Sequence, residues 1–122
     1  PFKDVTRQVL YDGAYDIPCQ FRYFECLPGG YSTLEYHEHT HMVMIFRGKG
    51  QLLLGDEIHD VESGDFIEIP GKTIHQFRAN KGDYIGFLCL VNQERDKVKL
   101  LSPEEMETLQ ANPKIKEFLE SC

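Results

Sequence analysis

Apolar and polar residues alternate in short stretches along the first 92 residues of the chain. Alternation with a period of two is typical of half-buried β-strands, and the glycine and proline clusters between the stretches indicate turns. The pattern predicts strands at about residues 6–11, 19–27, 31–46, 51–54, 58–61, 66–69, 73–78 and 84–91. Turns are predicted at residues 12–13, 28–30, 47–50, 55–57, 62–65, 70–71 and 80–83. Many short strands at regular spacing indicate an all-β barrel or sandwich.

The pattern changes near residue 102, where helix signals replace strand signals. Ser102 is a favourable N-cap, Pro103 suits the first helical position, and Glu105 completes a capping box. We expect one helix to about residue 111 and a second from residue 113, with an apolar stripe of Ile115, Phe118 and Leu119. The chain is therefore predicted to be a single domain over residues 1–122. Its barrel would span about 5–92, and its helical tail, at about 102–121, would cover a mouth or outer face of that barrel.

The composition excludes several classes of function. The chain has 122 residues, enough for one sizeable core, and a formal net charge of −7. This charge argues against a nucleic acid or an anionic membrane as the main partner. No apolar run approaches a membrane span, and no signal-like stretch opens the chain, so we expect a cytoplasmic protein. The four scattered cysteines (Cys19, Cys26, Cys89 and Cys122) are expected to be reduced thiols.

The candidate chemistry lies in the histidines. His37, His39 and His41 stand at alternate positions, so in an extended strand they would share one face, ~7 Å apart, with Glu35 at the same parity. A fourth histidine, His75, follows the turn at Pro70 and Gly71. Because imidazole is a common ligand of transition metals, four such rings could close a divalent-metal site. The alternative is that the histidines lie on a solvated face of a sheet.

Two motifs in this region resemble those of the cupin superfamily. The first is the run from Gly30 through His37-Glu38-His39 to Gly48, and the second joins Gly64, Pro70 and His75 with the family spacing. The resemblance implies a double-stranded β-helix, or jelly-roll barrel, with short C-terminal helices and a metal site inside. The position of the family's glutamate is taken here by His41. The resemblance thus implies a four-histidine site of His37, His39, His41 and His75, with Glu35 as the alternative if His41 does not reach the metal.

The resemblance also implies a class of function. Cupins of this kind include dioxygenases, decarboxylases, isomerases and lyases that act on small organic molecules. The alternative is a non-catalytic cupin that binds a metal or a small ligand. The metal is expected to be Zn, Fe, Ni, Mn or Cu, because imidazoles favour transition metals over Ca and Mg. The resemblance and the apolar strands before residue 28 together predict a homodimer.

Further expectations concern residues around the site. The pocket wall is expected to be apolar, from Phe66 or Ile67, Phe77 and Met44. Glu35 is expected at a solvated edge, although it is the one carboxylate that strand parity places on the histidine face. His59 is expected on the surface. The cysteines are not expected to be ligands; among them, Cys89 has the best chance of facing the pocket.

Overall fold

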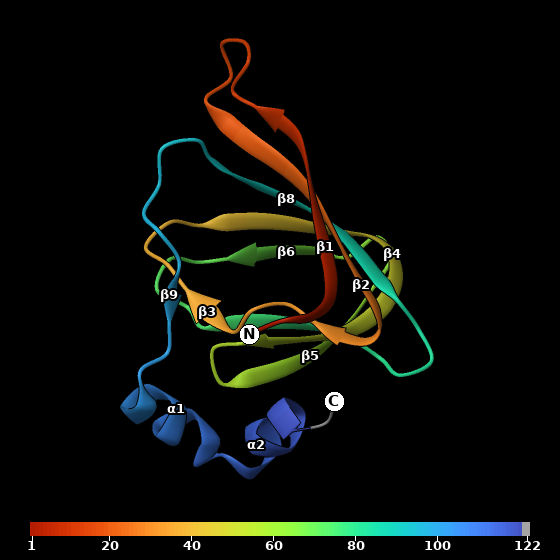
Figure 1. Ribbon diagram of the computed structural model, residues 1–122, viewed down its shortest axis with the longest axis vertical. Helices are drawn as coiled ribbons and strands as arrows, with labels where there is room; N and C mark the ends of the chain where they lie inside the picture. Colours follow the sequence, from red (N-terminus) through yellow and green to blue (C-terminus); the bar gives the residue numbers. More distant parts are fainter. Residues whose placement is uncertain (121–122) are drawn as a thin grey trace.

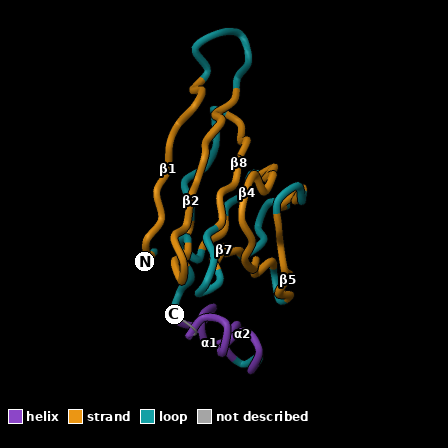
Figure 2. The backbone as a smooth tube through the Cα atoms, turned by 90° about the vertical axis from the view of Figure 1, so that its right-hand side faces the viewer, coloured by secondary structure: helices purple, strands orange, loops and turns teal. Residues whose placement is uncertain are grey.

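The computed structural model describes residues 1–120 and contains a barrel followed by two helices (Figure 1). In the described chain the strands are β1 (Lys3–Asp12), β2 (Cys19–Tyr31), β3 (Glu35–Tyr36), β4 (His41–Leu54), β5 (Glu57–Glu62), β6 (Phe66–Ile69), β7 (His75–Ala79), β8 (Ile85–Asn92) and β9 (Lys99–Leu100). The helices are α1 (Pro103–Gln110) and α2 (Pro113–Glu120). The β1–β2 hairpin extends from one end of the barrel, and the helices lie at the other (Figures 1 and 2).

Strand β4 connects the two halves of the barrel. Its first half pairs with β6 and β8, and its second half pairs with β5 and β7, all antiparallel. The bend lies at a register shift between Ile45 and Arg47 and at Gly48, which has a φ of 77°. A side chain at Gly48 would collide with the carbonyl of Tyr84. The predicted turn at 47–50 is therefore wrong, because glycine here bends a continuous strand. The predicted turn at 28–30 is likewise part of β2.

The barrel interior is filled by inward-facing residues of β2, β4, β7 and β8. On β4, Val43 and Ile45 are buried, whereas Met44 is 45% exposed and points outward. Phe66, opposite Met44 on β6, is 60% exposed. Met44 and Phe66 therefore do not line the pocket, because they share the opposite parity from His41. The expected alternatives face inward instead: Val43, the neighbour of Met44, lines the cavity, and Ile67 packs against the core. Phe77 does face the interior, where its ring stacks on that of Phe87 at 4.1 Å.

The two helices cover an outer face of the sheet. Helix α1 has the predicted cap, with reciprocal hydrogen bonds between Ser102 and Glu105 and with Pro103 in its first turn. Ile115 and Phe118 of α2 are buried in a second apolar cluster together with Leu34, Leu53 and Leu109. Strand β7 is consequently buried on both faces, toward the barrel interior and toward the helices.

The predicted fold class is confirmed, since the chain forms a mostly β barrel with two short C-terminal helices. No helix within residues 1–120 is long and apolar enough to cross a membrane. Cys19, Cys26 and Cys89 are free thiols, and Cys122 lies outside the described residues. His59 is exposed, as expected.

Candidate metal centre

The four predicted histidines come from three places in the chain. His41 is the first residue of β4, and His75 is the first residue of β7. His37 and His39 lie in the bend between β3 and β4, so the prediction that all three neighbouring histidines share one strand is wrong. The bend is held by other loops, because the amide of Lys72 donates to the carbonyl of His37 at 2.6 Å. The rings therefore converge through a tight bend rather than through the pleat of a strand.

Three of these histidines form a compact buried group. One ring nitrogen from each of His37, His41 and His75 lies within 4.8 Å of the others. The rings of His37 and His41 stack with their centroids 4.0 Å apart, and the ring of His75 meets that of His37 edge-on at 4.9 Å. All three side chains are at least nine-tenths buried. Their separation allows one ion to contact a nitrogen of each ring.

Hydrogen bonds from the outer nitrogens orient two of these rings. His37 Nδ1 lies 2.8 Å from the carbonyl oxygen of His39, and His75 Nδ1 lies 3.0 Å from that of Thr73. Because a carbonyl only accepts, both Nδ1 atoms carry the proton and both Nε2 atoms keep a lone pair. His37 Nε2 is buried without a hydrogen-bond partner among the described residues. A buried, unpaired lone pair beside two other imidazoles fits a divalent metal ion.

Burial keeps this group neutral. It lowers the pKa of His75 to about 4 and that of His41 to about 2, and it also lowers the pKa of His37. Neighbouring imidazoles lower these values further because each would repel a second positive charge. Neutral imidazole is the form that binds metal, so the site is prepared to do so at neutral pH. Nitrogen donors of this kind suit Zn, Fe, Ni or Cu.

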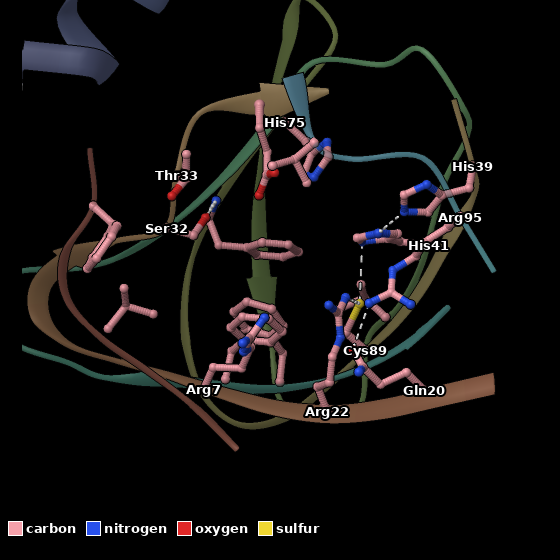
Figure 3. Close-up of a pocket in the computed structure, with 18 of the residues that line it drawn as sticks. Arg7, Gln20, Arg22, Ser32, Thr33, His39, His41, His75, Cys89 and Arg95 are labelled. Carbon is pink, nitrogen blue, oxygen red and sulfur yellow. Dashed lines mark hydrogen bonds between the residues drawn. The ribbon is translucent and has the colours of Figure 1, made fainter. Parts of the chain in front are cut away.

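His39 stands beside this group in a different environment. Its Nδ1 lies 2.7 Å from a carboxylate oxygen of Asp96. On the other side of the ring, its Nε2 lies 2.9 Å from Nε2 of His41, as Figure 3 shows. The pKa of Asp96 falls to about 2, first because the amide of Glu38 donates to it and then because of His39. The carboxylate fixes the tautomer of His39 so that Nε2 faces the other rings. Sequence reasoning missed Asp96, which stands in a loop without a recognisable motif. That His39 completes the ligand set stays a prediction.

The histidines open onto a cavity of about 950 Å³. Its wall carries His39, His41 and His75, apolar side chains including Phe24, Phe77 and Phe87, and the carboxyl of Glu35. One oxygen of Glu35 is buried without a hydrogen-bond partner, and burial raises the pKa of this carboxyl to about 7. The expectation that Glu35 lies at a solvated edge is therefore wrong, because β3 turns it into the barrel where it pairs with the start of β7.

A thiol and a guanidinium group complete the wall on the other side of His41. Cys89 Sγ lies 3.4 Å from His41 Nδ1, and Arg22 donates to the same sulfur at 3.2 Å (Figure 3). Arg22 and Cys89 are direct partners across β2 and β8, so their side chains share the inner face. The expectation that Cys89 faces the pocket is confirmed. Arg22 could not be identified from the sequence, because the inward-facing positions of β2 are set by its pairing with β8.

The comparisons with known proteins agree with this geometry. The Cupin_2 family model, described as a cupin domain, matches residues 22–91. The chain is 45% identical over 98% of its length to the 1-methylthio-D-xylulose 5-phosphate methylsulfurylase of Rhodospirillum rubrum, and it covers 76% of that protein. A cupin-2 domain crystal structure from R. rubrum has a TM-score of 0.93 and 45% identity, with 98% of this chain and 80% of that one covered. A cupin 2 conserved barrel domain protein from Rhodopseudomonas palustris has a TM-score of 0.93 and 50% identity, with coverages of 97% and 81%.

Proposed function

The chain belongs to the cupin family, as a small Cupin_2 domain protein, and from that premise we propose that it is a metal-dependent enzyme that removes the methylthio group from a small ketose phosphate. The substrate class follows the name of the R. rubrum relative, which the chain resembles over almost its whole length. The observation that carries the proposal is a free thiol, Cys89, in the same cavity as the buried histidines. A thiol is the side chain suited to accept a methylthio group.

We propose that His37, His39, His41 and His75 hold the metal. When bound, a divalent ion would act as a Lewis acid toward the oxygens of the ketose and so make the carbon beside the carbonyl easier to ionise. Four neutral imidazoles would leave the ion its full charge. This choice excludes Glu35 from the ligand set, and the compact grouping of His41 with His37 and His75 supports it.

Cys89 is placed to take up the sulfur. Its thiolate would attack the methylthio sulfur and form a disulfide, while the electrons of the broken carbon–sulfur bond remain on the carbon, which then takes a proton. Burial raises the pKa of Cys89, and the charge and hydrogen bond of Arg22 offset part of that rise. If His41 binds metal through Nε2, its Nδ1 carries a proton and also donates to the sulfur. A small external thiol would then have to reduce the disulfide before another turnover.

Glu35 is the proposed acid–base group. Its raised pKa, about 7, lets the carboxyl give or take a proton at neutral pH, and its free oxygen lies in the cavity wall. In this role it would protonate the carbon that loses the methylthio group. Its distance in sequence from Cys89 is no obstacle, since both side chains line one cavity.

The test is methylthio release from 1-methylthio-D-xylulose 5-phosphate by metal-loaded protein in the presence of a small thiol. We expect Cys89→Ser to abolish release while metal content is unchanged, and Cys19→Ser, outside the cavity, to behave as wild type. A stoichiometric methylthio adduct on Cys89 should appear by mass spectrometry when the external thiol is omitted. Absence of release by the wild type with every transition metal tried would reject the proposal and favour a non-catalytic binding cupin.

We also propose that the chain forms a homodimer. Apolar side chains that are 42–60% exposed gather on the outer face of β4 and β6, namely Met42, Met44, Phe46 and Phe66. The β1–β2 hairpin adds Val9 and Leu10, which are 43% and 49% exposed. Exposed apolar sheet surfaces are commonly covered by a second subunit. Light scattering at micromolar concentration should give twice the chain mass, and a monomer would remove the idea.

A further inference from the structure

Three arginines from separate parts of the chain line the same cavity as the histidines. Arg7 comes from β1, Arg22 from β2, and Arg95 from the segment after β8. All three are drawn in the wall of the cavity in Figure 3, where Arg22 and Arg95 lie near Cys89. They form a local cationic cluster in a chain whose net charge is −7. The function proposed above assigns no ligand to this cluster.

The cluster has no counter-ion within residues 1–120. None of the three arginines has a carboxylate at ion-pair distance there, although exposed arginine and lysine residues such as Arg47 and Lys99 do. Arg95 donates only to neutral oxygens, those of Asn92, Gln93 and Gln20. Burial and the charge of Arg22 lower the pKa of Arg95, the carboxylate of Asp12 in the same cavity partly offsets this, and Arg7 lowers the pKa further. The guanidinium groups therefore repel one another, and Asp12 acts on Arg95 without lying at ion-pair distance.

Arg22 is the critical member because it is only 6% exposed. One of its terminal nitrogens donates to the sulfur of Cys89, but its Nε has no hydrogen-bond partner within the described chain. A buried cation with an unused donor is costly unless something supplies the opposite charge. Glu35 in the same cavity interacts with Arg22 through charge, but burial raises the pKa of this carboxyl to about 7. The missing partner is therefore expected to be an anion that enters the cavity.

We propose that Arg22, Arg95 and Arg7 form a phosphate subsite that binds the phosphomonoester end of the substrate. Several cations without a counter-ion match a dianion better than a single-charged carboxylate, and guanidinium groups bind phosphate oxygens with paired hydrogen bonds. The identity of the ketose part of the substrate rests on the proposed function. The phosphate group is assigned from the arginine cluster alone. The arginines would thus bind the phosphate end of a ketose phosphate, and its carbonyl end would lie beside the histidines.

The test is titration of inorganic phosphate into metal-loaded protein by calorimetry. We expect Arg22→Gln and Arg95→Gln each to weaken phosphate binding by roughly 10- to 100-fold, because each removes charged hydrogen bonds. Arg22→Lys should retain part of the affinity. Arg47→Gln serves as the control, since Arg47 is exposed, pairs with Glu25 and lies outside the cavity. Metal content and melting temperature measured on each variant separate loss of the anion site from loss of the metal or of the fold.

Two further measurements test whether Arg22 serves the Cys89 thiol instead of phosphate and whether phosphate binds the metal instead of the arginines. Cys89→Ser should bind phosphate within about threefold of wild type; an equal loss there would mean that Arg22 serves the thiol instead. Equal affinities of the wild type and both arginine variants would place phosphate on the metal and overturn the subsite, as would acetate binding as tightly as phosphate. Phosphate binding that depends on the arginines, in a protein that releases no methylthio group, would uphold the subsite and reject the proposed reaction.

Discussion

Two arginines of this barrel are almost equally buried, and they have opposite surroundings. Arg22 is 6% exposed and Arg78 is 7% exposed. Arg78 points from β7 toward the helices, where its Nε donates to Gln76 at 3.0 Å and a terminal nitrogen donates to the carbonyl of Leu119 at 2.9 Å. Its guanidinium group also lies 4.3 Å from the centroid of the Tyr31 ring. Arg78 is therefore a structural cation that joins the barrel to α2.

Arg22 points the other way, into the cavity, and its hydrogen-bonding capacity is only partly used. Its Nε has no partner in the described chain, as is also true of one oxygen of Glu35 and of His37 Nε2. These three atoms are the buried side-chain polar atoms without a partner among residues 1–120. Burial alone thus does not mark the functional side of the molecule. What distinguishes it is that the polar groups around the cavity remain unsatisfied, whereas those under the helices are satisfied.

Strand β7 offers the sharpest test of this distinction, because His75 faces the site and Arg78 faces the helices. We expect His75→Ala to weaken metal binding by roughly 100- to 1000-fold, since the proposed four-ligand site, if worth ~10–16 kcal/mol, would lose about a quarter of its donors. The same substitution should change the unfolding free energy of the metal-free protein less than it changes the free energy of metal binding. Metal content by elemental analysis and affinity by competition with a chelator check this outcome. His59→Ala, at an exposed histidine, is the matched control. Full metal occupancy of the His75 variant would refute the site.

Arg78→Ala should do the opposite: it should lower the stability of the fold and leave metal binding almost unchanged. It removes two hydrogen bonds from a charged group and leaves the carbonyl of Leu119 unpaired, so we expect unfolding free energy to fall by about 2–3 kcal/mol. Metal affinity should remain within about threefold of wild type. Denaturant unfolding of metal-free protein gives the first quantity, and chelator competition gives the second. Arg47→Ala, which breaks an exposed ion pair with Glu25, should cost less than about 1 kcal/mol. A large loss of metal in the Arg78 variant would mean that the two faces are not independent.

The elements of the fold that could be predicted are those that local sequence determines. The strand at Phe66–Ile69 and the capping box at Ser102 appear where alternation and cap chemistry place them. The bend of β4 at Gly48 could not be predicted. Glycine is required there because the carbonyl of Tyr84 leaves no room for a side chain, and Tyr84 is distant in sequence. Strand β9 is two exposed residues long and carries no apolar pattern.

The residues of the site can likewise be divided into those that local sequence could predict and those that it could not. The buried cluster of His37, His41 and His75 could be anticipated because His37 and His75 stand at positions of a known motif and His41 takes the place of the motif's glutamate. Arg22 could not, since its contact with Cys89 joins residues 67 positions apart and depends on the register of β2 against β8. Asp96 is likewise remote in sequence from His39, 57 positions away. Partners that orient a site are thus harder to predict than the groups that form it.

Asp96→Asn probes the part of the metal site that remains a prediction, the role of His39. The carboxylate accepts from His39 Nδ1 and fixes its tautomer, so we expect its loss to weaken metal binding by about 10-fold if His39 is a ligand. No change in affinity would remove His39 from the ligand set and leave three histidines. The measurement is chelator competition, with Asp83→Asn as a control because the Asp83 side chain makes only a long ion pair, 3.9 Å, with Lys49 and lies outside the cavity.

In the pH dependence of the metal-free protein, the titratable groups of the cavity oppose one another. The folded-state pKa of His75 is about 4 and that of His41 about 2, below the 6.5 of a free imidazole, so the unfolded chain takes up more protons as pH falls below 6.5. Each such histidine should cost stability on the order of 1 kcal/mol per pH unit of acidification until its folded pKa is reached. Glu35 acts in the opposite direction, because its folded pKa of about 7 exceeds its ordinary value of 4.5.

Between pH 7 and 4.5 the folded protein therefore gains a proton at Glu35, and this gain offsets part of the loss from the histidines. Because His37 is shifted in the same direction as His41 and His75, the net effect is a loss of stability on acidification. Glu35→Gln removes the offset, so its unfolding free energy should fall more steeply than that of wild type from pH 6.5 to 4.5 and should exceed the wild-type value near pH 8. Urea unfolding of chelator-treated protein at several pH values measures both slopes. Parallel slopes would show that Glu35 is ionised in the cavity, and Arg22 would then have the counter-charge that it otherwise lacks.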